Sequence, residues 1–520
     1  MKIQPLMALV VLSLPTGPGV RAAIREFKAR TLGLLALACL LVAAPATAQV
    51  NYAVSGNTAY VTESPNASGD IVIASTFNGY PVTVIGIFAF SRCTNLTSVT
   101  IPNSVTIIAN TVFYDCINLT NVIIGNSVAS IGEFAFSGCT SLTSVTIPNS
   151  VTSIKGLAFA RCTSLTSVII GNSVTSIEGG AFSGCTSLTN LSVDAANPVY
   201  SSLDGVLFDK AQTTLITFPP GRSGSYVIPD SVTSIEGNAF SGTSLTSVTI
   251  GNSVTSGDAA FGRTSLTNLS VAAANPVYGS LDGVLFDKAQ TTLIIFPPGR
   301  GGSYVIPNSV TSIGQQAFYG CTSLTNVTIP NSVASIGDRA FENCISLTSV
   351  TIGNSVTSIG DRAFSGCTSL TSVTIPNSVT IIGDAAFSNC TNLTNFTFLG
   401  NAPSLIPDWH VGGFTQFASV GPGAKAYYYC GTTGWGTNYA GLPTVMLCAP
   451  QIAPGSAGVK PGGFGFTLTS LTNQTIVVEA SVNLVNWQPI WTNALPGASA
   501  EFVDPEWLQH SNRFYRARSD

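Results

Sequence analysis

Charged residues and histidine are both scarce in this sequence, and each scarcity excludes some classes of function. Charged residues are only 8% of the 520 residues, against about 25% in an ordinary soluble domain. The net charge of −4 offers no basic surface that would collect nucleic acid. The two histidines, His410 and His510, have no Cys, Asp or Glu at metal-ligand spacing beside them. We therefore expect no catalytic residues, no metal or cofactor, and no nucleic-acid partner.

A hydrophobic run long enough to span a membrane is also missing from the mature chain. The run from Leu32 to Ala44 follows four basic residues and precedes Ala46-Thr47-Ala48, which is typical of a cleaved export signal. We predict that residues 1–48 are a signal peptide and that the mature protein is secreted or held at the cell surface.

What the sequence does contain is a repeat. Hydrophobic residues make up 45% of the chain, which is enough for a packed core. Nine cysteines mark a period of 23 residues in two runs: Cys93, Cys116, Cys139, Cys162 and Cys185, then Cys321, Cys344, Cys367 and Cys390. A fixed period of this size indicates a solenoid, in which each repeat is one coil stacked on the last. We predict a β-rich solenoid over residues 91–398.

One coil, Cys344 to Gly366, shows the expected local structure. Val350 and Ile352 are two residues apart, so both lie on the same face of a strand. Gly353-Asn354 predicts a corner before a second short extended piece. Gly360 to Phe364 predicts a helical or 3₁₀ turn whose phenylalanine points inward and lies on the phenylalanine of the next coil. The series is Phe90, Phe113, Phe136, Phe159, Phe182, Phe240, Phe261, Phe318, Phe341, Phe364 and Phe387.

The recurring pattern Ala-Phe-x-x-Cys-x-x-Leu-x-x-Val-x-Ile-Pro-x-x-Val-x-x-Ile-Gly resembles the BspA-type leucine-rich repeats of bacterial and protist surface proteins. The resemblance covers roughly residues 50–398, and residues 49–90 are similar to the N-terminal cap of that family. It implies a leucine-rich-repeat solenoid, export to a bacterial cell surface, and a role in adhesion or interaction. The family has no shared catalytic residues that would imply an enzyme.

Two near copies, residues 190–226 and 268–304, interrupt the period. Each contains Leu-Asp-Gly-Val-Leu-Phe-Asp-Lys and Phe-Pro-Pro-Gly-Arg, and the Asp-Lys-Ala-Gln segment predicts a β-hairpin. Each copy also carries an acidic pair: Asp204 with Asp209, and Asp282 with Asp287. We interpret these carboxylates as turn residues, and a weak calcium site is the alternative.

After residue 398 the repeat pattern stops, and all five tryptophans follow it. We expect a C-terminal cap over 399–450, a Pro- and Gly-rich linker over 451–463, and a small all-β module over 464–520. The nine repeat cysteines are expected to form a buried, unpaired ladder. The sequence does not decide whether Cys430 and Cys448 in the cap form a disulfide.

Outward strand positions of the repeat are small and polar, and they predict a flat sheet rich in hydroxyl and amide groups. The candidate binding residues on it are Ser98, Thr100, Ser144, Thr146, Asn326, Thr328, Ser349, Thr351, Ser372 and Thr374. This surface favours a non-enzymatic protein that binds an extracellular protein or glycan weakly at many positions. One alternative is a structural envelope or matrix spacer. Another is ice binding by regular threonine rows, which Ile123 and Ile169 interrupt.

Overall fold

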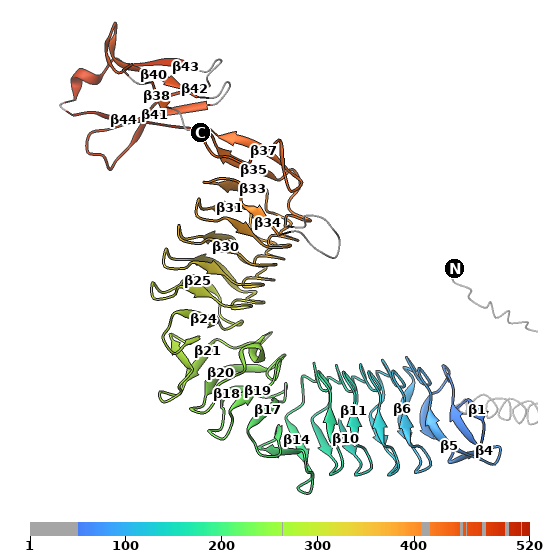
Figure 1. Cartoon of the computed structure of the whole chain (residues 1–520). Helices are drawn as coiled ribbons and strands as arrows, with labels where there is room; N and C mark the ends of the chain where they lie inside the picture. The colour runs from blue at the N-terminus through green and yellow to red at the C-terminus, as the bar shows by residue number, and fades with distance from the viewer. Residues whose placement is uncertain are drawn as a thin grey trace, which may run out of the picture.

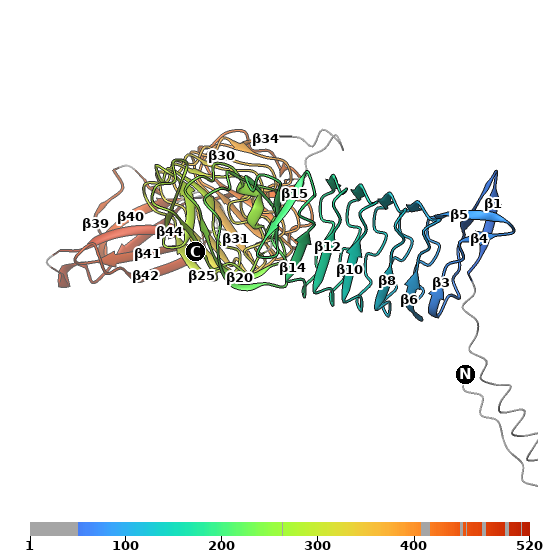
Figure 2. The same cartoon turned by 90° about the horizontal axis from the view of Figure 1, so that it is seen from below.

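The computed structural model describes residues 50–262, 264–406, 416–447, 451–453, 455–470, 475–494, 499–510 and 512–519. The predicted signal peptide, His410 and Cys448 lie outside these residues. The repeats stack into a solenoid with two straight arms that meet at a bend, and a separate β module follows (Figure 1). Seen from below, the first arm lies across the view while the second arm is seen nearly end-on (Figure 2).

In the first arm, each regular coil contributes one short strand to each of two sides, and the second side is divided into two sheets. One sheet contains β1 (Tyr52–Ser55), β2 (Thr58–Val61), β4 (Thr76–Phe77), β5 (Tyr80–Ile85), β7 (Ile107–Ile108), β9 (Ser130–Ile131), β11 (Ser153–Ile154) and β13 (Ser176–Ile177). The other side contains β3 (Gly69–Val72), β6 (Leu96–Thr100) and β8 (Asn121–Ile123), then β10 (Ser144–Ile147), β12 (Ser167–Ile170) and β14 (Asn190–Val193). The antiparallel β1–β2 hairpin closes the N-terminal end of the first sheet.

The first insertion and the coils after it form the bend (Figure 1). The predicted hairpin is present, because β16 pairs antiparallel with β17. One sheet here contains β15 (Tyr200–Leu203), β16 (Val206–Asp209), β17 (Thr214–Thr217) and β19 (Ser234–Ile235). A second sheet contains β18 (Ser223–Val227), β20 (Ser244–Ile250) and β21 (Asn268–Val271). The 3₁₀ helix η1 (Asp258–Phe261) lies between β20 and β21 in the chain.

The second insertion begins the second arm. Its first sheet contains β22 (Tyr278–Leu281), β23 (Val284–Asp287), β24 (Thr292–Ile295), β26 (Ser312–Ile313), β28 (Ser335–Ile336), β30 (Ser358–Ile359), β32 (Ile381–Ile382) and β34 (Ser404–Leu405). The other side contains β25 (Gly302–Val305), β27 (Leu324–Thr328) and β29 (Ser349–Thr351), then β31 (Ser372–Ile375), β33 (Asn395–Phe398), β35 (Lys425–Tyr429), β37 (Leu442–Leu447) and β36 (Asn438–Tyr439). Strands of successive coils pair in parallel, and the β36–β37 hairpin ends the stack.

The phenylalanine column forms the centre of the solenoid core. Neighbouring rings stack at centroid distances near 5 Å, for example 5.0 Å between Phe341 and Phe364. Three further rings that the predicted series omitted, Phe218, Phe296 and Phe417, belong to the same column. Within the described residues, no ring contact crosses from Phe182 to Phe218 or from Phe261 to Phe296. The column is therefore divided into three segments at the two insertions.

The corner that contains each phenylalanine has the i→i+3 bonds of the predicted 3₁₀ turn, but it is not a regular helix. It is a chain of tight turns, and among the described repeat residues a regular 3₁₀ helix forms only at η1. Arg362 has a φ of 54°, and this left-handed conformation stops a right-handed helix. Alternate residues then face different partners, because Ala363 N–H bonds Gly360 in the same coil while Phe364 N–H bonds Ala386 of the next coil at 2.7 Å. No helix in the described part of the chain is long and apolar enough to cross a membrane.

The C-terminal module packs two antiparallel sheets around Phe466, Leu468, Ile476, Val478 and Phe502. Its strands are β38 (Gln451–Ile452), β39 (Gly458–Lys460), β40 (Gly463–Thr469) and β43 (Ser499–Asp504) in one sheet, and β41 (Thr475–Ser481), β42 (Gln488–Ala494) and β44 (Phe514–Ser519) in the other, with the 3₁₀ helix η2 (Trp507–Gln509) between β43 and β44. The segment 451–463 was predicted to be a linker, but β38 and β39 pair with β40. Pro461 and Gly462 form the turn between β39 and β40.

Candidate functional site

The ten predicted binding positions all lie on strands of the second side of the coil, which we call the outer face. Ser98 and Thr100 are half-buried, and the other eight are exposed. Parallel pairing aligns Asn326 with Ser349 and Thr328 with Thr351, so equivalent positions form two columns along the arm. The columns continue one period later at Ser372 and Thr374 of β31.

The C-terminal cap extends both columns with residues that the sequence analysis missed. Asn395 aligns with Lys425, and Thr397 aligns with Tyr427, because β35 pairs with β33. Tyr427 is half-buried and Lys425 is exposed. Thr397 and Tyr427 are 30 residues apart, not 23, so the period gave no signal that these side chains would share a column. The face therefore gains an aromatic ring and a cation on β35, one strand before β37.

Hydrogen bonding determines which hydroxyl groups of the outer face are available. The threonine before the first outward position donates to the backbone of the previous coil, as Thr348 Oγ1 does to the Thr325 carbonyl at 3.1 Å. By contrast, the side chains of Ser349, Thr351, Ser372 and Thr374 make no hydrogen bond within the described chain. These four side chains keep their donors and acceptors for a ligand, whereas the amide of Asn326 bonds Ser303 at 3.0 Å.

The first arm presents a less uniform face. Ser98 and Thr97 both donate to Asp70, and these two bonds lower the pKa of its carboxyl group. The second column alternates hydroxyl and aliphatic side chains, with Val72, Ile123 and Ile169 exposed by 74%, 53% and 49%. The continuous polar columns therefore belong to the second arm.

The nine repeat cysteines are free and buried. Each thiol donates to a backbone carbonyl of the preceding coil or cap, and in eight coils the acceptor is a phenylalanine, as from Cys344 Sγ to Phe318 O at 3.0 Å. Burial raises the pKa of the Cys116 thiol to about 12 and that of Cys139 well above its usual value. These thiols are therefore parts of the core and are poorly suited to nucleophilic or metal chemistry.

The acidic residues of the insertions hold turns. Asp287 Oδ1 accepts the N–H groups of Thr291 and Thr292 at 2.7 and 2.8 Å. Burial alone would raise its pKa, but these bonds outweigh burial and lower the pKa of Asp287. Asp282, with a φ of 49°, forms the β22–β23 turn, and its carbonyl accepts a bond from Arg300. Within the described ranges, no three His, Cys, Asp or Glu side chains are grouped to hold a metal.

The remaining candidate residues lie in the tail. His510 is exposed, and its backbone N–H bonds the Trp507 carbonyl. Cys430 is exposed and free, while its candidate partner Cys448 and the second histidine, His410, are outside the described residues.

Comparison with known proteins places these features in context. The chain matches the family described as "BspA type Leucine rich repeat region" at residues 75–201, 222–287 and 302–407. It is similar to a leucine rich cell surface protein from Faecalibacterium prausnitzii (31% identity, 74% of this chain and 96% of that chain, TM-score 0.45). It is also similar to the pneumococcal vaccine antigen PcpA, with 18% identity over 76% of this chain and 92% of that chain and a TM-score of 0.39. A leucine-rich repeat protein from Bacteroides ovatus is similar at 23% identity over 77% of this chain and 98% of that chain, with a TM-score of 0.31. No curated protein matches.

Proposed function

The chain belongs to the BspA-type leucine-rich repeat family, and from this premise we propose that it is an exported bacterial surface protein that acts by binding rather than by catalysis. Its ligand would be an extracellular protein or glycan, and the binding surface would be the outer face of the second arm. The predicted export signal supports the location, and the two polar columns support the surface.

One observation carries this proposal: Ser349, Thr351, Ser372 and Thr374 are exposed, and their side chains are not used by hydrogen bonds within the described chain. Exposed polar groups on a rigid sheet are already ordered, so a ligand that bonds them loses little of the entropy that flexible side chains would cost. Small side chains also leave the sheet flat, which lets a partner contact several coils at once.

Tyr427 and Lys425 supply what the columns lack. Binding energy concentrates in aromatic and cationic anchors, whereas serine and threonine contribute little individually. We propose that the partner is anchored at the Tyr427 end and extends toward β27 along the columns. Affinity would then rise with the number of coils that the ligand contacts.

The test uses the full chain on an array of glycans and extracellular proteins, followed by titration of each ligand found. Two arginines placed in one column, Ser349→Arg with Ser372→Arg, should abolish binding by obstructing the face. Tyr427→Ala should weaken it by about tenfold or more, as expected for an interface anchor. Gln315→Arg is the matched control, because Gln315 is exposed on a corner away from the outer face.

Saturable binding that survives the double arginine variant would contradict the proposal and move recognition to another surface. Absence of saturable binding to every ligand would contradict it as well, and would favour a structural spacer. Thermal unfolding of each variant shows whether a loss of binding reflects loss of the fold.

A further inference from the structure

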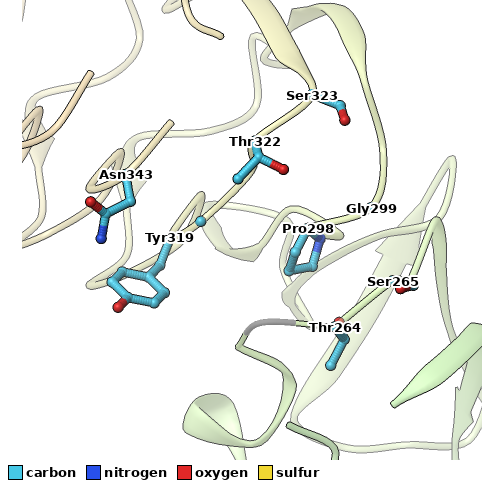
Figure 3. Close-up of a pocket in the computed structure, with 9 residues that line it drawn as sticks. Thr264, Ser265, Pro298, Gly299, Tyr319, Thr322, Ser323 and Asn343 are labelled. Carbon is cyan, nitrogen blue, oxygen red and sulfur yellow. The ribbon is translucent and has the colours of Figure 1, made fainter. Parts of the chain in front are cut away.

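A cavity of about 530 Å³ lies between the second insertion and the coils before and after it. It is lined by loops that lead from the corner to the outer-face strands, and not by those strands themselves. Figure 3 shows Tyr319 and Asn343 on one side of it and Thr264 and Ser265 on the other, with Pro298 between them. The cavity is therefore separate from the two polar columns and draws on four successive coils.

A proline explains why the cavity forms here. In regular coils, the residue two positions after the phenylalanine donates its N–H to the next coil, as Asn343 does to Ser365 at 2.8 Å. In the second insertion this position, two residues after Phe296, is Pro298, which has no N–H to donate. Phe296 N–H still bonds the Ala317 carbonyl of the next corner at 2.7 Å, but the second bond that this position usually makes is missing, which leaves the loop at Pro298 less closely held to the next coil.

The lining of the cavity is polar but uncharged. Ser265, Thr322 and Ser323 contribute hydroxyl groups and Asn343 contributes an amide, and all four residues are exposed. The hydroxyl of Thr264 is already bonded to the Phe261 carbonyl at 3.0 Å, so it contributes only shape. Among the described residues that line the cavity there is no Asp, Glu, Lys or Arg. An acidic ligand would find no cation among these residues, and a purely apolar ligand would leave the hydroxyl groups without partners.

Tyr319 adds an aromatic ring to these polar groups, next to the apolar ring of Pro298. A pyranose has the complementary surface, with C–H groups on its faces and hydroxyl groups around its edge. Hydroxyl and amide side chains both donate and accept, so they can pair with sugar hydroxyls. The volume lies within the range of about 300–1,000 Å³ that small-molecule sites occupy. We propose that this cavity binds a neutral hexose unit of a glycan.

A second cavity, about 790 Å³ in volume, shares Tyr319 and continues along the bend past Gly262 and Ala259 to the first insertion. A glycan seated against Tyr319 therefore has room to extend along the bend, and longer oligosaccharides should bind more tightly than a monosaccharide.

The first insertion provides an internal comparison, since it repeats the second insertion 78 residues earlier. Ser187, Pro220 and Gly221 occupy the positions of Ser265, Pro298 and Gly299. However, Ser241 stands where the second copy has Tyr319. The two copies therefore share the serine and the proline at these positions, and only the second copy has an aromatic residue at the position of Tyr319.

The experiment titrates the full chain with neutral trisaccharides of glucose, mannose and galactose, and with sialylated and sulfated trisaccharides, by calorimetry and ligand-observed NMR. We expect one neutral trisaccharide to bind with a Kd near or below about 1 mM. Tyr319→Ser should weaken it by about tenfold, the size of one aromatic contact. Asn389→Ala, at the same corner position as Asn343 in a coil that lines neither cavity, should leave this binding unchanged.

Asn343→Ala provides a second variant if Tyr319→Ser lowers the thermal midpoint, since Asn343 is exposed and its loss should also weaken binding. Ser241→Tyr should raise the number of bound trisaccharides above that of the parent chain. The proposal is overturned if no neutral trisaccharide binds at about 10 mM, if only acidic trisaccharides bind, or if Tyr319→Ser and Asn343→Ala both bind as the parent does. The same titration in the Ser349→Arg and Ser372→Arg variant, whose outer face is obstructed, distinguishes binding in the cavity from binding on the outer face.

Discussion

At the scale of single residues, the cysteine ladder combines two functions that are usually separate. Each side chain fills the core beside a phenylalanine, and each thiol also satisfies a carbonyl group of the preceding coil, as Cys367 does for Phe341 at 3.2 Å. The sequence predicted the burial from the apolar neighbours of each cysteine. It could not predict the hydrogen bond, because the acceptor lies 26 residues earlier and becomes adjacent only when the coils stack.

This environment predicts selective chemical labelling. At pH 8 a thiol whose pKa is about 12, such as that of Cys116, has a thiolate fraction on the order of 10⁻⁴, and the thiolate is the reactive form. Iodoacetamide should therefore modify Cys430 in the native protein and leave the nine ladder cysteines unmodified. Peptide mass spectrometry measures this directly, and the same treatment in guanidinium should modify the nine ladder cysteines as well. Rapid native labelling of Cys116 or Cys139 would show that the ladder opens.

A second residue-scale prediction concerns Glu479 in the C-terminal module. Its carboxylate accepts bonds from Arg516 and Arg518 at 2.6 and 3.1 Å, and these two partners lower its pKa. A lowered folded pKa stabilises the fold above the unfolded value of about 4.3, and that contribution is lost as the pH falls through the folded value. Glu479→Gln should therefore unfold more easily than the parent at pH 7.

The difference between the parent and Glu479→Gln should shrink as the pH falls from 5 toward 3, because protonation removes the same charge from the parent. Thermal unfolding monitored by tryptophan fluorescence reports on the module, which contains Trp487, Trp491 and Trp507. A difference that stays constant over this pH range would assign the effect of the substitution to packing instead.

At the scale of one coil, proline and glycine alternate at the first corner in much of the chain. Pro330-Asn331 is followed by Gly353-Asn354, and Asn354 N–H bonds Asn331 Oδ1 at 2.8 Å. Gly353 has no side chain, and this allows the close approach: a Cβ there would lie 2.6 Å from the Pro330 carbonyl carbon. The coils are therefore locally paired, which a period of 23 residues does not reveal.

Gly353→Ala should destabilise the second arm by about 1–3 kcal/mol, the usual cost of overpacking against an unyielding backbone. Gly179→Ala is the matched control, because nothing lies within 4 Å of a Cβ at Gly179. Its effect should stay within about 0.5 kcal/mol. Chemical denaturation of both variants makes the comparison, and equal midpoints would mean that the Pro330 corner yields at little cost.

Whether the secondary structure of a segment could be predicted depended on what its sequence pattern reports. Strands such as β29 and β30 were predictable because alternation of polar and apolar residues reports directly on which face is buried. The corner was predicted as a helical or 3₁₀ turn, and its i→i+3 bonds, such as Ala363 N–H to the Gly360 carbonyl, are of the 3₁₀ kind. The positive φ of Arg362, whose N–H bonds Asp384 of the next coil, was not predictable from the spacing. The segment 451–463 was misassigned because glycine and proline favour both linkers and tight turns.

At the scale of the whole molecule, the insertions divide one continuous stack into separate cores. One buried cluster includes Ala59 to Leu207, a second Val206 to Ile295, and a third Val284 to Leu442. The divisions coincide with the gaps in the phenylalanine column and with the bend in Figure 1. The period in the sequence predicted a stack but not these divisions, since they depend on how the two hairpins displace the corner.

Separate cores predict that the arms unfold independently, because in a repeat protein each coil is stabilised mainly by its neighbours. Phe136 is fully buried in the first arm, and its ring stacks at 5.0 and 5.1 Å on its two neighbours. Phe136→Ala should cost about 3–5 kcal/mol and should increase hydrogen exchange across the first arm, with little change between residues 302 and 447. Phe341→Ala, at the equivalent position of the second arm, should give the reverse pattern. If either substitution raised exchange equally in both arms, the solenoid would be a single cooperative unit, and the insertions would bend the stack without dividing it.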